Sequence, residues 1–429
     1  MKLITNDFKN EPYWWEKTPR PEVANIHLPK HAEVLIIGAG YTGLSAAIQI
    51  ARGGREVVVV DAEQAGWGCS SRNGGQVSSS IKPDYPSLSA KVGEDSAFNI
   101  IQEGHNALQW IADFIEQEAI DCDFRRVGRY CAAHSQRQFD ALDKQLSATP
   151  AAFSVDSHMV EKKDQYEELG TDAYYGGMVS TKHASLDPGR YHQGLYEIAR
   201  DAGVVIIPFC KVDDINRNRV GFEISTAKGK IEADKVVVAT SGYTGKATPW
   251  HQRRIIPIGS YMIATEEIDK SLMDKLMPKD RVITDTKKLV VYYRSSPDRK
   301  RILFGGRVSI GETPLLTSAP RLHQLMVNIF PELSACKISH CWMGFVGYTF
   351  DNLPHLGHED GLYYSMGYCG SGISLSSYMG ARIGQQLLGL VDGKTALDDR
   401  EFQTRPLYRG KPWFLAPSVS YYRIKDKFT

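Results

Sequence analysis

The sequence has almost no excess of charge of either sign, since 51 lysine and arginine residues against 50 aspartate and glutamate residues leave a net charge of +1. Proteins that hold nucleic acid or an anionic membrane surface through charge usually carry a marked basic excess, so we expect neither partner. No apolar run approaches the ~20 residues of a membrane-spanning helix. The N-terminal segment has acidic residues and no apolar secretory core. These absences predict a cytoplasmic protein that does not enter a membrane.

Cysteine and histidine are present without the spacings that build a covalent or metal framework. The seven cysteines are odd in number and scattered, and no C-x-x-C occurs. The twelve histidines show no H-E-x-x-H or comparable ligand spacing. We therefore expect no disulfide framework and no metal site, and a reducing cytosol fits best.

Glycine is concentrated in a stretch near the N-terminus around which the rest of the chain is organised. Residues 34–37 are a short apolar run typical of a buried strand, residues 44–51 continue as an apolar helix, and residues 57–60 form a second buried strand. Such an order predicts a βαβ unit. Its turn has the spacing G-x-G-x-x-G and its second strand ends on an acid; these residues are Gly38, Gly40, Gly43 and Asp61.

Each residue type of this motif has a physical task in binding a dinucleotide. Gly38 permits the tight strand-to-helix turn, Gly40 leaves room for a pyrophosphate, and Gly43 lets the helix pack close to the strand. The helix start offers N–H groups and positive dipole charge to the phosphates. Asp61 is placed to accept hydrogen bonds from a ribose diol. The alternative is a glycine-rich turn that only packs, but the complete βαβ context favours a dinucleotide.

A loop rich in glycine, serine and asparagine follows the βαβ unit and reads GWGCSSRNGGQVSSS, residues 66–80. It would bring several backbone N–H groups toward an anion or a flat ring. The alternative is a solvent-exposed flexible linker. We favour a binding role because Arg72, Asn73 and Gln76 stand in it as fixed polar groups directly after the cofactor motif.

Later segments repeat the strand, glycine turn and helix pattern. A helix over 187–202 and a strand over 204–208 resemble the second half of a doubly wound sheet. The strand 235–240 ends in SGYTG, and the turn YCGSG at 368–372 precedes a helix over 373–390. Gly380 and Gly384 lie on one face of this helix, which permits close packing on a neighbour. By contrast, short strands at 258–265, 288–294 and 301–305 with turns between them suggest an antiparallel sheet. The predicted fold is therefore α/β, with a discontinuous Rossmann-like domain and a smaller antiparallel-sheet domain of α+β type.

Taken together, the motifs resemble those of the D-amino-acid-oxidase-like family of FAD-dependent amine and amino-acid oxidoreductases. The resemblance rests on GAGYTGLSAA, VVVVD, SRNGGQ, VVVATSGYTG and GYCGSGI, and covers almost the whole chain. The loop RNGGQ and the aromatic tail PWFLAPSVSYYRIKD look most like the γ-glutamylputrescine oxidase branch. With FAD as the cofactor, the expected division is 1–90, 151–257 and 336–400 for FAD binding, 91–150 as a substrate or covering region, 258–335 as the substrate domain, and 401–429 as a C-terminal tail. Residues 1–30, at the start of the first part, are expected to form an irregular arm, because they carry Pro12, Pro19, Pro21 and Pro29.

The resemblance implies which residues hold FAD. The β–α turn and its acid would hold the ADP half, the following loop would flank the isoalloxazine ring, and the last glycine turn would direct a helix N-terminus at the flavin. Val212 would meet the adenine, although an ordinary strand residue is an alternative there. The residues are Gly38, Gly40, Tyr41, Gly43, Asp61, Ser71, Arg72, Asn73, Gly75, Gln76, Val212, Ser241, Gly242, Gly370, Ser371, Gly372 and Ile373.

Two departures from the family pattern bear on how the flavin is held. Family members commonly have Gly-His-Gly in the last turn, where this chain has Gly370–Ser371–Gly372. Sarcosine oxidases attach FAD to a cysteine, whereas Val346 or Gly347 falls near that position here and Cys341 lies too far upstream. We therefore expect non-covalent FAD.

The family chemistry is removal of a hydride from the carbon beside an amine nitrogen, followed by imine hydrolysis and reoxidation of the flavin by O2 to give hydrogen peroxide. Few acid–base residues are needed, because holding a neutral amine at the reacting distance is most of the task. We expect Gln76, Tyr261, Tyr293 and Arg307 to contact the substrate, with aromatic faces around an amine and the guanidinium on a carboxylate. The alternative is that the tyrosines are sheet-core residues and the arginine is solvated.

Four functional hypotheses follow. The first is an oxidase of a secondary amine or N-substituted amino acid, with O2 as acceptor. The second is a dehydrogenase of the same fold that passes electrons to a quinone or an electron-transfer protein. A non-catalytic FAD-bound partner protein and an NAD-dependent dehydrogenase are the third and fourth, and the last of these predicts a colourless protein.

Overall fold

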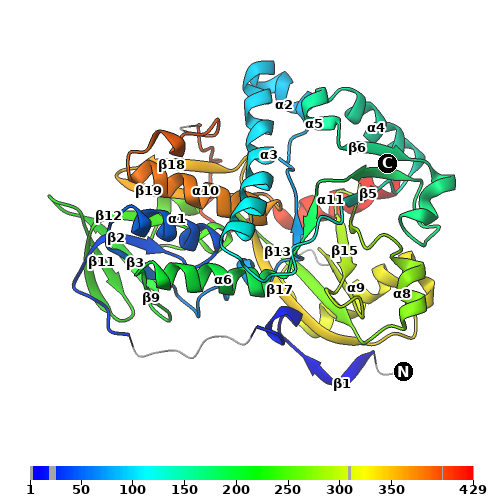
Figure 1. Cartoon of the computed structure of the whole chain (residues 1–429), viewed down its shortest axis with the longest axis horizontal. Helices are drawn as coiled ribbons and strands as arrows, with labels where there is room; N and C mark the ends of the chain where they lie inside the picture. Colours follow the sequence, from blue (N-terminus) through cyan, green and yellow to red (C-terminus); the bar gives the residue numbers. More distant parts are fainter. Residues whose placement is uncertain (1–2, 19–25, 308–310, 399, 429) are drawn as a thin grey trace.

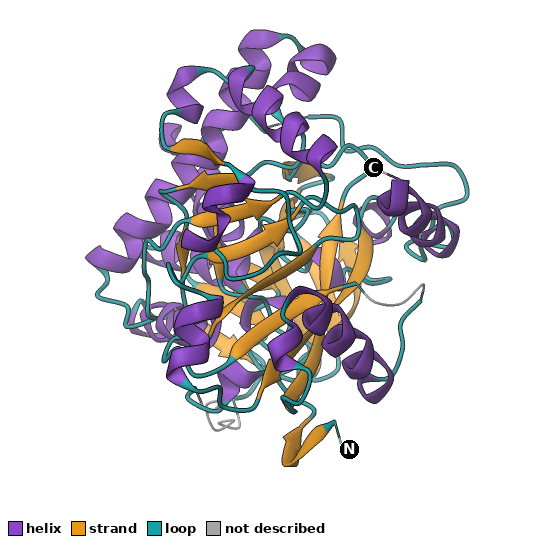
Figure 2. Cartoon of the chain, turned by 90° about the vertical axis from the view of Figure 1, so that its right-hand side faces the viewer, coloured by secondary structure: helices purple, strands orange, loops and turns teal. Residues whose placement is uncertain are grey.

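Two β-sheets that lie side by side, with helices around them, make up the fold in the computed structural model of the chain (Figure 1). The structure describes residues 3–18, 26–307, 311–398 and 400–428. Figure 2 shows the strands in the interior and most of the helices outside them. The two-sheet arrangement confirms the predicted α/β class with a Rossmann-like domain and a second, antiparallel sheet.

The Rossmann-like sheet is built on parallel strands whose side chains are buried on both faces. The first two strands of the sequence motif pair in parallel, with Val34 opposite Val57 and Ile37 opposite Val60, as continuous apolar runs predict. The sheet order is β10-β11-β12-β2-β3-β9, and β19 pairs with β12 and β18. Its strands are β2 (His31–Ile37), β3 (Val57–Val60), β9 (Val205–Ile207), β10 (Val212–Arg217), β11 (Phe222–Thr226), β12 (Gly229–Val238), β18 (His355–Glu359) and β19 (Leu362–Met366).

The antiparallel sheet collects strands from more of the chain than the sequence division suggests. Its order is β1-β17-β13-β16-β15-β14-β5-β7-β6, and only the pairs β1 with β17 and β14 with β5 are parallel among the described residues. The strands are β1 (Ile4–Lys9), β5 (Arg129–Ala132), β6 (Ser157–Val160), β7 (Gly177–Ser180), β13 (Ile256–Thr265), β14 (Val282–Asp285), β15 (Val291–Ser295), β16 (Ile302–Gly306) and β17 (Ile338–Tyr348). A short separate pair is β4 (Gln76–Val77) with β8 (Ala184–Ser185).

This pairing differs from the expected division at three places. β6 and β7 come from the part assigned to FAD binding at 151–257, and β17 comes from the part assigned at 336–400. β1 lies in the N-terminal arm, which the sequence presents as irregular; residues 19–25 of that arm lie outside the described part. A strand belongs to the sheet with which it forms hydrogen bonds, and its partners can lie far away in the sequence. A division of the chain into linear segments therefore misses strands that pair outside their own segment.

Helices cover the two sheets, and the helix that starts the βαβ unit packs directly on the last glycine-containing helix. A Cβ built on Gly380 would lie 2.4 Å from Thr42 O, and one on Gly384 would lie 2.9 Å from Ala46 O. The predicted role of these glycines in close helix packing therefore holds. The helices are α1 (Tyr41–Arg52), α2 (Tyr85–Val92), α3 (Glu94–Gln117), α4 (Gln136–Ser147), α5 (Ala151–Ser154), α6 (Pro188–Asp201), α7 (Pro249–Gln252), α8 (Lys270–Leu276), α9 (Leu315–Ile329), α10 (Gly372–Leu387) and α11 (Leu415–Phe428).

The two faces of the antiparallel sheet have different neighbours, and this decides which side chains reach the cofactor domain. Side chains alternate between the faces along each strand. One face is buried with α8 and α9 and carries Tyr261, Ile263, Tyr293 and Phe304. The opposite face carries Met262, Ala264, Leu303 and Trp342, which cluster with Tyr13 and Trp14 of the N-terminal arm.

A buried histidine of α7 makes the stability of the fold depend on pH. His251 is 1% exposed, and neither ring nitrogen has a hydrogen-bond partner in the described part of the chain. Burial lowers the pKa of His251 to about 3. The folded state keeps the ring neutral while the unfolded chain protonates it below its usual pKa, so stability is present above ~6.5 and is lost as the pH falls toward 3.

We therefore expect the free energy of unfolding to fall by up to about 1.4 kcal/mol per pH unit in this window because of His251. The His251→Phe variant should lack this contribution, so the difference between wild type and variant isolates it. Burial raises the pKa of Asp187 to about 6 and of Asp285 to about 7, which acts in the opposite sense but equally in both proteins. Urea unfolding from pH 4 to 8 measures the difference. Parallel pH profiles of the two proteins would contradict the assignment.

Candidate dinucleotide and substrate site

The turn between β2 and α1 has the geometry that its glycines predict. Gly38 has φ +109°, and its N–H donates to Val60 O at 2.8 Å. A Cβ built on Gly43 would lie 1.8 Å from Gly38 O, so no larger residue fits without moving the helix. The acid at the end of β3 is held beside the turn, since Asp61 accepts hydrogen bonds from Ala39 N at 2.7 Å and Glu63 N at 2.9 Å.

The start of α1 is joined to the following loop through one serine. Ser70 Oγ accepts a hydrogen bond from Tyr41 N at 3.0 Å. A Cβ built on Gly40 would lie 2.8 Å from the same oxygen, so a side chain there would displace the loop. The Tyr41 hydroxyl donates to Pro188 O at 3.1 Å, and burial raises its pKa well above the usual value. The helix N-terminus, the loop and the start of α6 therefore form one packed unit.

The loop from Gly66 to Gln76 is hydrogen-bonded along its length and does not have the structure of a solvated linker. Asn73 Nδ2 donates to Cys69 O and Ser70 O, each at 3.1 Å, and Asn73 Oδ1 accepts from Gly75 N at 2.9 Å. Arg72 Nε donates to Trp67 O at 2.6 Å. These contacts present the loop as a fixed surface beside the βαβ unit.

Arg294 of β15 anchors this loop to the antiparallel sheet, and the sequence motifs did not single it out. It is 2% exposed, and its NH1 donates to Gly75 O at 3.1 Å and Leu186 O at 2.8 Å. Its Nε donates to Ser295 O at 2.9 Å. Burial lowers the pKa of Arg294 to about 10, so the guanidinium remains charged at neutral pH. The one sequence signal for such a role is an arginine that directly follows the apolar run VVYY in a predicted strand.

The two later glycine turns, at residues 241–242 and 370–372, pack beside the strands and loop already described. A Cβ on Gly242 would lie 2.7 Å from Phe345 O, and Ser241 beside it has φ +39°. Gly370 has φ +99°, and a Cβ there would lie 3.5 Å from Tyr348 Oη and 3.8 Å from Lys82 Nζ. Just inside α10, Ser374 donates to Ser78 O at 2.6 Å. The N-terminus of α10, containing Gly372 and Ile373 and preceded by Ser371, therefore lies against the strand that follows the loop.

Val212 lies at the other end of this arrangement. It starts β10, is 9% exposed, and packs in an apolar cluster with Val58 and Val60 of β3. Cys210, two residues earlier, donates its backbone N–H to Asp61 O at 2.7 Å. Val212 is thus near the strand end that carries the acid, and its contact with an adenine stays a prediction.

The groups around this turn fit a dinucleotide. The cradle between Gly40 and Ser70, which a Cβ would fill, the helix N-terminus and the fixed carboxylate of Asp61 are the groups that a pyrophosphate and a ribose diol need. Within the described ranges, no group of three or more histidine, cysteine, aspartate or glutamate residues is arranged to hold a metal ion. In the same residues, no helix is both long and apolar enough to cross a membrane.

Of the residues predicted to contact the substrate, Tyr261 and Arg307 both contact Glu312, and Tyr293 lies in the same apolar cluster as Tyr261. Tyr293 stacks on Phe304 with ring centroids 5.3 Å apart, in the cluster under α8 and α9. The Tyr261 hydroxyl donates to Glu312 Oε2 at 2.9 Å, and Arg307 NH1 donates to Gly259 O at 2.8 Å on this same side. Both tyrosines therefore point to the helix-covered face of the sheet, away from the loop.

Gln76 does lie at the boundary between the loop and the sheet. Its Nε2 donates to the carbonyl oxygens of Ile283 at 3.1 Å and Tyr293 at 3.4 Å. On the loop-facing side of the sheet, the ring of Tyr292 lies 3.0 Å from a Cβ built on Gly74. The Tyr292 hydroxyl is 3.0 Å from Ser260 Oγ. Tyr292 and Ser260 are the sequence neighbours of the predicted Tyr293 and Tyr261. Adjacent residues of a strand point to opposite faces of the sheet, and which face meets the loop depends on tertiary packing.

The fold and the site define a dinucleotide-dependent enzyme with a discontinuous cofactor domain and a second sheet facing it. Residues 33–386 match the family described as DAO, FAD dependent oxidoreductase. The chain therefore belongs to this family and is a FAD-dependent oxidoreductase, which confirms the resemblance drawn from the motifs.

Similarity to known proteins extends over nearly the whole chain. It is 28% identical over 407 residues to the probable oxidoreductase OrdL of Haemophilus influenzae, covering 93% of both chains. It is 28% identical over 398 residues to the gamma-glutamylputrescine oxidoreductase of Escherichia coli strain K12, covering 92% of this chain and 93% of that one. Among solved structures, glycine oxidase from Geobacillus kaustophilus has a TM-score of 0.72 at 18% identity, covering 88% of this chain and 99% of that one. This last likeness shows the fold alone.

Proposed function

We propose that the protein oxidises a secondary amine or N-substituted amino acid of the γ-glutamyl-polyamine type, with non-covalent FAD and O2 as electron acceptor. The observation that carries this proposal is the similarity, along almost the full length, to the gamma-glutamylputrescine oxidoreductase of E. coli. The OrdL relatives of H. influenzae and Rhizobium meliloti have the same 28% identity. An amine beside an oxidisable carbon is the substrate class that this similarity supports.

FAD supplies the hydride acceptor when it is bound, and the chain supplies its position. The β2–α1 turn with Gly38, Gly40 and Gly43 would hold the pyrophosphate, Asp61 the ribose, and the loop with Arg72 and Asn73 the ring system. The last glycine turn before α10 would direct positive dipole charge at the ring. Non-covalent binding is supported because Val346 and Gly347 carry no thiol.

Candidate thiols elsewhere do not favour attachment of the flavin either. Burial raises the pKa of Cys69 and of Cys369 to about 11, so both are protonated at neutral pH. A protonated thiol is a poor nucleophile. Cys341 lies in the core cluster on the helix-covered face of the antiparallel sheet.

The loop-facing side of the antiparallel sheet is the proposed amine site, with Tyr292 and Ser260 as its polar groups and Gln76 at its border. Burial raises the pKa of Tyr292, so its hydroxyl stays neutral and serves as a hydrogen-bond donor or acceptor. A neutral hydroxyl pair can orient an uncharged amine without stabilising its protonated form. This matters because a hydride leaves readily only from the carbon beside a neutral nitrogen.

The Tyr292→Phe variant is expected to lower kcat/KM about tenfold, the effect of one lost hydrogen bond of ~1.4 kcal/mol in the transition state. Tyr293→Phe is the matched control, because the Tyr293 side chain is buried on the other face of the sheet, in the cluster with α8 and α9. It should leave kcat/KM unchanged. Steady-state kinetics of both variants decide, and the reverse order of effects would restore Tyr293 as the substrate contact.

The proposed function is tested by an anaerobic screen for flavin bleaching near ~450 nm, the band that marks the oxidised cofactor. The screen covers γ-glutamyl polyamines, N-alkyl amino acids, free amino acids and hydroxy acids. Rapid bleaching by γ-glutamyl polyamines is expected. Bleaching by hydroxy acids alone would contradict the amine assignment, and no bleaching by any compound would leave a non-catalytic FAD-bound protein as the better description.

The electron acceptor is tested separately, since relatives with 22% identity include D-amino acid dehydrogenases of Helicobacter pylori. Hydrogen peroxide formed in air in a 1:1 ratio to oxidised amine supports O2 as the acceptor. Turnover that needs an added quinone, with no peroxide, would assign the protein to the dehydrogenases.

A further inference from the structure

An N-terminal arm, residues 3–18, begins with β1 (Figure 1) and contacts the loop that is proposed to flank the flavin through two hydrogen bonds. Its two tryptophans belong to a short 3-10 helix, η1 (Tyr13–Trp15). Trp15 Nε1 donates to Ser71 Oγ at 2.9 Å, and Trp14 Nε1 donates to Asn73 O at 2.9 Å. These residues are 56 and 59 positions apart in the sequence, so the contacts are tertiary and not part of the loop's own fold.

A third indole completes this arrangement from the antiparallel sheet. Trp342 Nε1 of β17 donates to Arg72 O at 2.8 Å. Three consecutive loop residues, 71 to 73, are therefore each held by an indole N–H from outside the loop. A hydrogen bond from a buried indole fixes both distance and direction, since this side chain has a single donor.

The arm also encloses the side chain of Arg72. The guanidinium carbon lies 4.7 Å from the centre of the Trp15 ring and 4.4 Å from that of Trp67. Arg72 NH1 donates to Met343 O at 3.3 Å. Cation–π attraction on two sides and a carbonyl partner leave the guanidinium little rotational freedom.

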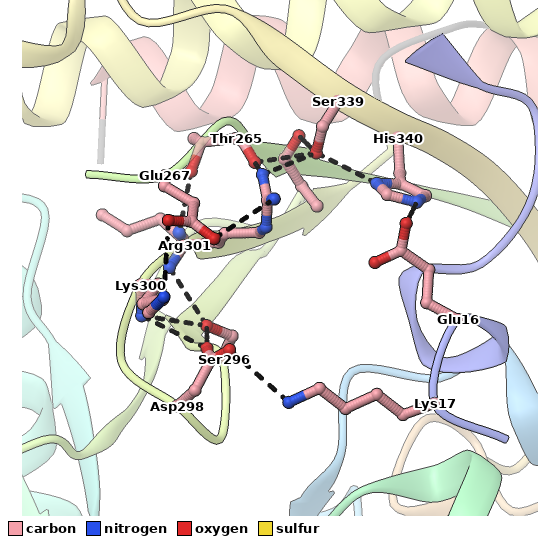
Figure 3. A network of polar contacts seen from close by, with 12 residues as sticks. Glu16, Lys17, Thr265, Glu267, Ser296, Asp298, Lys300, Arg301, Ser339 and His340 are labelled. Carbon is pink, nitrogen blue, oxygen red and sulfur yellow. Dashed lines mark hydrogen bonds and ion pairs between the residues drawn. The ribbon is translucent and has the colours of Figure 1, made fainter. Parts of the chain in front are cut away.

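Polar contacts hold the arm itself on the antiparallel sheet. β1 pairs in parallel with β17. Figure 3 shows Glu16 reaching the buried His340, 3.1 Å from its Nε2, and Lys17 reaching Asp298 at 3.5 Å. Lys9 Nζ lies 2.6 Å from Glu16 Oε1. Trp14 is 1% exposed and packs with Met262, Leu303 and Trp342.

We propose that the N-terminal arm is a positioning element of the cofactor site, in which Trp15 holds the side chain of Ser71, Trp14 holds the backbone of Asn73, and the Trp15 ring fixes the orientation of Arg72. This rests on the proposed function, because the loop is taken as the surface that flanks FAD. The physical reason is entropy, since a loop whose polar groups are already satisfied in one conformation loses less freedom when a ligand binds. Trp14 and Trp15 themselves act through the loop and need not touch the cofactor.

The arm–loop contact is tested first in the apoprotein, by the rate at which trypsin cleaves after Arg72. Cleavage of a native protein tracks the population of the locally opened form. Trp14→Phe and Trp15→Phe each remove one indole donor and keep an aromatic ring, so cleavage should become about tenfold faster in each. Trp110→Phe in α3, whose ring stacks on Phe114 of the same helix and, among the ring contacts of the described residues, on no residue of the arm, is the matched control and should cleave at the wild-type rate.

The consequence for FAD is measured in the same variants by titration of the apoprotein and by the flavin absorption spectrum. Trp15→Phe should raise the dissociation constant about tenfold and shift the flavin band, and Trp110→Phe should do neither. Unchanged FAD affinity and spectrum in both arm variants would overturn the proposal, as would unchanged cleavage after Arg72. A wild-type protein that binds no FAD would refute the proposed function, whereas faster cleavage in the arm variants would still show that the arm fixes the loop.

Discussion

The Arg294→Met variant is expected to lose about 3 kcal/mol or more of its free energy of unfolding. The guanidinium donates to the carbonyl oxygens of Gly75, Leu186 and Ser295. Gly75 O keeps a second hydrogen bond, from Leu186 N at 3.0 Å, so Leu186 O and Ser295 O are the acceptors most exposed to loss of this donor. An unsatisfied buried acceptor costs about 1–3 kcal/mol. Methionine recovers part of the cost of burying a charge, but it has no donor to replace the three lost hydrogen bonds.

The same change is expected to weaken FAD binding, because Gly75 lies in the loop that Arg294 holds to the antiparallel sheet. Urea unfolding followed by tryptophan fluorescence measures the stability, and titration of the apoprotein with FAD measures the affinity. Arg52→Met is the matched control, since this arginine pairs with Glu118 on the surface and should cost no more than about 1 kcal/mol. A loss below about 1 kcal/mol at Arg294 would contradict the anchoring role.

The Gly43→Ala variant is expected to be destabilised by about 3 kcal/mol, opposite in sign to the usual effect of this change in a helix. Alanine normally favours a helix over glycine by about 1 kcal/mol. Here its Cβ would lie 1.8 Å from Gly38 O and 3.3 Å from Ile36 Cγ2, so α1 must move away from β2. Such overpacking usually costs about 1–3 kcal/mol and would also distort the turn proposed for the pyrophosphate.

Gly245→Ala is the control for Gly43, because a Cβ there would meet no heavy atom within 4 Å. It should change the stability by no more than about 0.5 kcal/mol. Thermal unfolding of the apoproteins and retention of FAD during purification distinguish the two variants. An alanine at position 43 that stabilises the protein, or leaves FAD affinity unchanged, would show that the helix does not approach the strand as closely as described.

Several elements could be predicted because their signals are local. The strand, glycine turn, helix and strand of the βαβ unit follow within 28 residues, and the structure has them as β2, α1 and β3. Helices with clear periodicity or capping residues also match, as with α6, whose N-cap Asp187 accepts hydrogen bonds from Gly189 N and Arg190 N. In each case, neighbouring residues along the chain supply most of the determining contacts.

Other parts depended on contacts that no local pattern contains. The assignment of β6, β7 and β17 to the antiparallel sheet follows from pairing with strands far away in sequence. The N-terminal arm reads as irregular, yet it contains a strand and two tryptophans bonded to the loop at 71–73. Arg294 reads as one charged residue in a strand, and only the fold gives it three carbonyl partners.

By itself, the sequence determined the class of cofactor. The turn that holds a dinucleotide depends on local backbone geometry, and Gly38, Gly40, Gly43 and Asp61 supply that geometry within one short segment. Only the tertiary structure decided which face of each antiparallel strand meets the loop, and so set Tyr292 against Gly74 and Tyr293 against Phe304. The physical reason is that side chains alternate with a period of two, and both faces of this sheet are covered by apolar neighbours. Alternation then identifies two sets of side chains, and only the packing of distant segments tells which set faces the cofactor.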